Sequence, residues 1–149
     1  GAFAVVTMLR RGGLEGDEID DFTGLARRNK WAAFVMLLFM FSLAGIPPTA
    51  GFIAKFYVFM AAVGANMTGL AVIAVVFAAI SAYFYLRVVM VMYMREPGET
   101  AGTPGYDVRV VASPATIAVL LVAALGVIVL GVFPDPLIQA AQSAILPLK

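Results

Sequence analysis

The position of one lysine, Lys55, points to chemistry in this sequence. It is the only charged residue in an apolar block of 34 residues, 31–64. A charged side chain inside a membrane span costs roughly 3 kcal/mol, and such residues usually lie on an ion or proton pathway. Histidine and cysteine are absent, so proton exchange must use a lysine or a carboxylate. The sequence therefore predicts that Lys55 exchanges protons.

The other explanation for Lys55 is a long side chain that reaches the outer membrane interface. Lys55 lies nine residues before Gly64, which is roughly 13 Å along a helix and strains such a reach. Burial and the positive end of a helix that begins just before it would both disfavour the charged amine.

A glycine and two prolines shortly before Lys55 predict a break in the helix. The block 31–64 would form a straight helix of about 51 Å, whereas the hydrocarbon core is about 30 Å thick. Adjacent prolines remove two N–H donors and exclude Ile46 from helical geometry. We expect half-helices near 31–44 and 48–63, with unpaired carbonyls of Leu43 and Ala44 as partners for the lysine. The predicted hinge residues are Gly45, Pro47, Pro48 and Gly51, and the last is expected to leave space for water or another group.

Arg87 is a second charge inside an apolar stretch. It lies eight residues before Arg95, so a side chain extended to the interface explains it. The functional alternative is a fixed charge that biases a neighbouring proton site. The tyrosines of the same stretch suggest an interfacial aromatic belt rather than a wet path; they are Tyr83, Tyr85 and Tyr93.

The composition and motifs exclude several classes of site. Hydrophobic residues make up 62% of the chain and charged residues 13%, against about a quarter charged in soluble domains. A net charge of +1 gives no sign of nucleic-acid binding. The paired glycines at 12–13 lack the lysine and the strand–helix context of a phosphate loop. The acidic cluster 17–21 is typical of a solvated loop, so we predict no metal and no cofactor in this chain.

The apolar blocks along the chain predict an all-α integral membrane fold with three transmembrane helices, the first discontinuous. We expect the chain to be part of a longer polypeptide, because a short apolar tail precedes the first loop. The predicted segments are the end of an upstream helix (1–9), a cytoplasmic loop (10–30), the broken helix (31–64, hinge 45–48), a second span (67–94), a cytoplasmic loop (95–112), a third span (113–133) and an interfacial C-terminal helix (135–149).

The basic residues predict the orientation. The loops 10–30 and 95–112 lie on one side and contain seven Lys or Arg residues, whereas the other side has only Lys149. The positive-inside rule places the two loops in the cytoplasm.

A longer motif resembles a known family. Residues 41–59 read FSLAGIPPTAGFIAKFYVF, which resembles the broken helix of the antiporter-like subunit N of bacterial NADH:quinone oxidoreductase, respiratory complex I. The flanking segments 22–25 (FTGL) and 82–88 (AYFYLRV) are similar to that subunit as well. Multisubunit cation/proton antiporters share a looser version of the motif. Lys30 departs from the pattern, since relatives often have proline there.

The resemblance implies a larger bundle of two inverted repeats, of which this chain is the C-terminal part. It implies that Lys55 occupies the position of a lysine or glutamate that exchanges protons with the outer side. It further implies a bacterial inner membrane location, lipid and other complex I subunits as partners, and NADH, FMN, iron–sulfur clusters and quinone in other subunits.

The function expected from this resemblance is proton translocation driven by quinone reduction elsewhere in the complex. One alternative is a subunit of a multisubunit Na⁺/H⁺ antiporter, and the subunits that copurify would separate the two. A further alternative is a structural membrane spacer, in which neutralising Lys55 leaves pumping intact.

Overall fold

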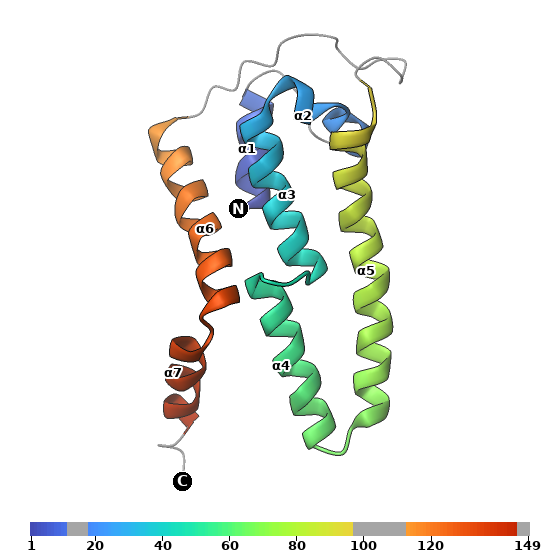
Figure 1. The fold of residues 1–149 in the computed structure, drawn as a ribbon, viewed down its shortest axis with the longest axis vertical. Coiled ribbons are helices and arrows are strands. Elements are labelled where there is room, and N and C mark those ends of the chain that lie inside the picture. The colour runs from blue at the N-terminus through green and yellow to red at the C-terminus, as the bar shows by residue number, and fades with distance from the viewer. Residues whose placement is uncertain (12–17, 97–112, 146–149) are drawn as a thin grey trace.

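The computed structural model describes residues 1–11, 18–96 and 113–145, and the described part is helical without strands (Figure 1). In chain order its elements are α1 (Ala2–Arg11), the 3₁₀ helix η1 (Ile19–Phe22), α2 (Leu25–Arg28), α3 (Lys30–Ala44), α4 (Ala50–Gly64), α5 (Thr68–Met94), α6 (Pro114–Val132) and α7 (Asp135–Ile145). The loop expected at 95–112 lies largely outside the described residues, as does the end of the predicted C-terminal helix.

The helices α3 and α4 lie end to end, and α5 runs antiparallel beside both (Figure 1). With 27 residues, α5 is about 40 Å long, whereas α3 and α4 have 15 residues each and are about 22 Å long. Neither half therefore crosses a hydrocarbon core of about 30 Å alone. α6 lies on the other side of the broken pair, and α7 continues below it (Figure 1).

Two helices in the described residues are long and apolar enough to cross a membrane, α5 and α6. Only 6% of the apolar window of α5 and 11% of that of α6 is buried within the chain. Such exposed apolar surface requires lipid or other protein around it, unlike the core helix of a soluble domain.

The buried core lies at the end of the molecule that carries the first loop. There α1, α2, α3, the end of α5 and α6 meet around fully buried Leu9, Leu25 and Met92. The backbone N–H of Gly24 donates to the Val91 carbonyl at 3.3 Å. By contrast, α4 contains no fully buried residue, although it packs against α3, α5 and α6.

Helix ends follow local chemistry. Asn29 caps α3, because its side-chain oxygen accepts from Ala32 N at 2.9 Å, and Ser113 caps α6 through Thr116 N at 3.2 Å, directly before Pro114. The second half-helix begins at Ala50 rather than near 48, because Thr49 keeps an extended backbone with φ −105° and ψ 157°. The irregular segment therefore covers residues 45–49.

Candidate functional site

The C-terminal end of α3 satisfies only part of its carbonyls locally. Gly45 adopts the left-handed conformation with φ +86°, which glycine tolerates best. Its N–H donates to the carbonyls of Phe41 at 3.0 Å and Ser42 at 3.1 Å, and Ile46 N also donates to Phe41 O at 3.0 Å. This is the common glycine ending of a helix. The last two carbonyls, those of Leu43 and Ala44, remain to be satisfied.

Lys55 satisfies both of them from the next helix. Its Nζ donates to Leu43 O at 2.9 Å and to Ala44 O at 3.0 Å, which are the two partners that the sequence predicts. Bonds from an ammonium are stronger than those between neutral groups. The negative end of the α3 dipole also favours a cation at this point. Lys55 is half-buried rather than fully buried, and its two bonds to the end of α3 stabilise the ammonium.

A cavity of about 270 Å³ lies beside the lysine, between the broken pair and α5. Of the ten residues that line it, only Lys55 has a polar side chain. The space arises because α5 presents small residues on this face, at the spacing of one side of a helix. The lining residues of α5 are Val75, Ala78, Ala79 and Ala82.

Gly51 does not provide the space that the sequence predicts. A Cβ atom at Gly51 would lie 1.8 Å from the Ser42 carbonyl oxygen and 2.7 Å from its carbon. Gly51 N also donates to Ser42 Oγ at 3.2 Å. The prediction of room for water at Gly51 is therefore wrong: the absence of a side chain lets α4 approach the α3 backbone. The cavity lies instead toward α5.

Arg87 lies away from this cavity. It follows Ala82 by five residues, which places it about 140° around the helix from that lining residue. Its side chain is exposed, and no hydrogen bond or ion pair joins it to the residues that the structure describes. Tyr83 and Tyr93 are also exposed, and none of the three tyrosines lines the cavity.

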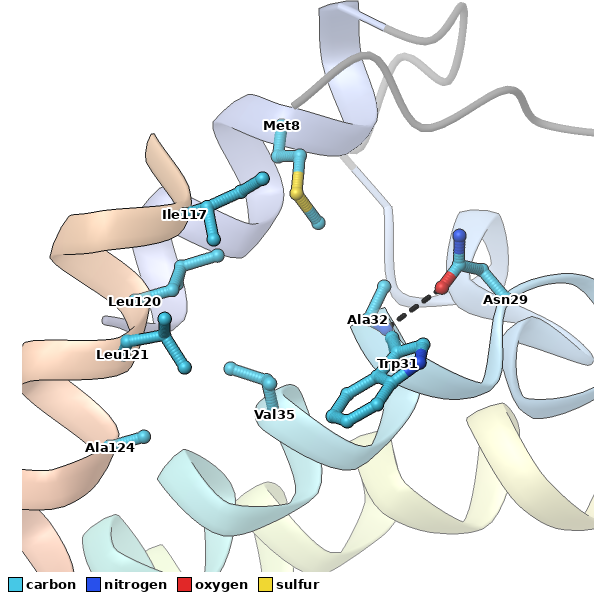
Figure 2. A pocket seen from close by; sticks show the side chains of 9 residues that line it. All are labelled: Met8, Asn29, Trp31, Ala32, Val35, Ile117, Leu120, Leu121 and Ala124. Carbon is cyan, nitrogen blue, oxygen red and sulfur yellow. Dashed lines mark hydrogen bonds between the residues drawn. The ribbon is translucent and has the colours of Figure 1, made fainter. Parts of the chain in front are cut away.

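A larger cavity, of about 480 Å³, lies on another side of α3 (Figure 2). Side chains of α1, α3 and α6 surround it, including Met8, Val35 and Leu121, with Asn29 and Trp31 at one side. None of its nine lining residues titrates in the physiological range. This cavity therefore provides no proton-exchanging group, and the smaller cavity beside Lys55 is the candidate site.

Two exposed ion pairs join the first loop to the end of α5. Arg27 contacts Glu96 at 2.8 Å, and Arg95 contacts Asp20 at 2.8 Å. Exposed pairs contribute about 0–1 kcal/mol each, so they orient the loop more than they stabilise it. Among the described residues, no three His, Cys, Asp or Glu side chains are grouped as a metal site requires.

The site also contains residues that the sequence pattern did not single out. They are Ser42 on α3, the small residues of α5, and Gly131 on α6. Small residues in apolar helices are the available signal, because they allow close helix approach. The sequence alone does not distinguish Gly131 from Gly126, since only the packing decides which glycine meets a neighbour.

Comparison with known proteins identifies relatives of this chain. Residues 1–81 match the family described as NADH:quinone oxidoreductase/Mrp antiporter, transmembrane. Subunit N of NADH-quinone oxidoreductase from Thiobacillus denitrificans is 46% identical over 146 residues, which are 97% of this chain and 29% of that protein. Subunit N 2 from Rhizobium meliloti is 47% identical over 144 residues, with coverage of 97% and 29%.

A solved structure gives the same result at the level of fold. A chain of respiratory complex I from Thermus thermophilus with bound aureothin superimposes with a TM-score of 0.64 and 30% sequence identity, covering 78% of this chain and 26% of that chain. The resemblance to subunit N is therefore confirmed. The chain spans less than a third of the length of the curated relatives it matches.

Proposed function

Because the chain belongs to the NADH:quinone oxidoreductase/Mrp antiporter transmembrane family, we propose that it forms part of the proton-translocating subunit N of NADH:quinone oxidoreductase. The names of the similar proteins support subunit N specifically. On this proposal the redox groups lie in other subunits, and this chain conducts protons. Its partners are other membrane subunits of complex I and the bilayer.

The observation that carries the proposal is the position of the Lys55 ammonium at the break. An ammonium has three N–H donors, and the carbonyls of Leu43 and Ala44 use two of them. The third is available to water in the adjacent cavity, whose volume of about 270 Å³ exceeds the roughly 30 Å³ that one water occupies in the liquid. Proton release passes H⁺ from this third N–H to water and leaves a neutral amine. Proton uptake reverses the step.

The proposal includes a membrane arrangement. The broken pair α3–α4, α5 and α6 are taken as three spans of a multi-pass protein in a bacterial inner membrane. The first loop is cytoplasmic and the turn between α4 and α5 lies outside, as the Lys and Arg distribution favours. The irregular segment 45–49 then lies within the membrane, where non-helical backbone is tolerated beside protein or a wet cavity.

Substitution of Lys55 in the intact complex tests the proposal. Lys55→Ala removes the exchangeable proton, and Lys55→Arg keeps a charge that does not dissociate. Both should lower the number of protons translocated per NADH oxidised. Proton uptake and NADH:quinone turnover are measured together in vesicles, after assembly has been checked. Lys30→Ala is the control, because Lys30 is exposed at the start of α3 and lies away from the cavity.

Normal assembly of Lys55→Ala with a wild-type proton-to-electron ratio would contradict the role of Lys55 and favour a structural spacer. The family description also includes Mrp antiporters, which gives a second candidate function. Sodium-dependent proton exchange, without copurifying NADH-binding and iron–sulfur subunits, would favour that candidate.

A further inference from the structure

α6 contacts the backbone of the helix break at one glycine. Gly131 is buried, one of only two buried residues in α6. A Cβ atom there would lie 2.2 Å from the Pro48 carbonyl oxygen, 2.5 Å from the Thr49 carbonyl carbon and 2.6 Å from Thr49 Cα. All three neighbours are backbone atoms, which cannot yield by rotating a side chain. Any side chain at position 131 therefore separates α6 from the break.

The backbone that Gly131 touches is the start of α4. Thr49 is buried and immediately precedes the helix. Its hydroxyl donates to Ile46 O at 2.7 Å, and its carbonyl accepts from Phe52 N at 3.1 Å. Lys55 follows within two turns of the same helix, so a displacement of residues 48–49 is transmitted to its ammonium.

The start of α4 is thus held from two directions. Gly51 packs against Ser42 of α3, and residues 48–49 pack against Gly131 of α6. In both contacts a glycine lies against backbone atoms, so these two contacts set how closely the start of α4 approaches α3 and α6.

We propose that Gly131 is a positioning residue for Lys55: its close contact with Pro48 and Thr49 holds α4 where the ammonium reaches both α3 carbonyls. The proposal rests on the proton-exchange function of Lys55 given above. Gly131 lies outside the family match, which ends at residue 81, so its role comes from the geometry.

The geometry sets the size of the effect. Ordinary contact with a Cβ begins at 3.4 Å, whereas the Pro48 oxygen would lie at 2.2 Å. The two helices must therefore separate by roughly 1.2 Å. A shift of that size along the Lys55 bonds, now 2.9 and 3.0 Å, would carry them past the usual limit of about 3.2 Å.

The test compares Gly131→Ala with Gly126→Ala in the intact complex. Gly126 lies in the same helix, and a Cβ added there would have no atom within 4 Å, so it is the matched control. Hydrogen exchange followed by mass spectrometry should show amides 49–53 exchanging about tenfold faster in Gly131→Ala. Gly126→Ala should leave them unchanged. This readout does not depend on pumping, so it stands even if Lys55 carries no proton.

Pumping measurements then test whether Gly131 acts through the lysine. Gly131→Ala should lower the proton-to-electron ratio about two- to tenfold and alter its pH profile, because the lysine loses its partners. In a Lys55→Ala background, Gly131→Ala should cause no further loss. Unchanged hydrogen exchange of amides 49–53 in Gly131→Ala would overturn the proposal. So would a fall in the proton-to-electron ratio in the Lys55→Ala background as large as the fall that Gly131→Ala causes alone. A wild-type ratio in Lys55→Ala alone would instead refute the proposed function.

Leu120→Ala provides a second variant if Gly131→Ala does not assemble. Leu120 is the other buried residue of α6. Truncating its side chain weakens the packing of α6 without introducing a clash. If α6 braces α4, exchange at 49–53 should again rise. Faster hydrogen exchange that is confined to the amides of α6 would overturn the proposal.

Discussion

Replacing Gly51 by alanine should separate the two half-helices without altering a charged group. The added Cβ would lie 1.8 Å from the Ser42 carbonyl oxygen, where ordinary contact begins at 3.4 Å. About 1.6 Å of movement is needed to relieve this overlap. Because Lys55 lies one turn further along α4, the movement also lengthens its bonds to the α3 carbonyls.

The energetic cost of Gly51→Ala is that of the less costly of two structural responses. If the helices do not move, overpacking costs about 1–3 kcal/mol. If α4 moves, the two bonds from the ammonium weaken, and each is worth about 1.5–3 kcal/mol. We therefore expect a local cost of about 1–3 kcal/mol, which raises the equilibrium constant for local opening of the break about 5- to 150-fold.

Hydrogen exchange of the assembled complex measures this opening. The amides of residues 49–53 report it, since Gly51 N donates to Ser42 Oγ in the native packing. The proton-to-electron ratio should fall in parallel. Gly64→Ala is the control, because Gly64 ends the same helix with no atom within 4 Å of the position of an added Cβ.

An assembled Gly51→Ala complex whose amides 49–53 exchange within about threefold of wild type would refute this reasoning. It would mean that α3 and α4 do not approach as closely as the geometry requires. Faster exchange in Gly64→Ala as well would attribute the effect to the helix in general rather than to this contact.

Three further outcomes are expected. Gly45→Ala should destabilise the break by about 1–2 kcal/mol, because its φ of +86° disfavours a side chain; unchanged exchange at the end of α3 would contradict this. Ala82→Leu should fill the cavity beside Lys55 and lower proton translocation, whereas Ala118→Leu, at an exposed position of α6, should not; equal proton-to-electron ratios in the two variants would count against a water path through this cavity. An impermeant thiol reagent added outside intact cells should label a cysteine at Asn66 but not one at Lys30, and the reverse pattern would invert the proposed orientation.

The sequence by itself determined the features that depend on local covalent chemistry. A glycine followed by two prolines ends a helix wherever it lies, so the break in 31–64 could be predicted within a few residues. The ending leaves the carbonyls of Leu43 and Ala44 unpaired, and a lysine a short distance on is within reach of them. Both partners of Lys55 were predictable for this reason.

The packing of distant segments was decided only by the tertiary structure. Gly51 was expected to leave space, but the α3 backbone at Ser42 occupies it. The cavity lies instead against α5, whose alanines are separated from Lys55 by more than twenty residues. Gly126 and Gly131 are alike as residues of one apolar helix, and they differ only because α6 crosses the break at the second. Such contacts depend on where whole helices lie relative to one another, and local residue chemistry does not specify that.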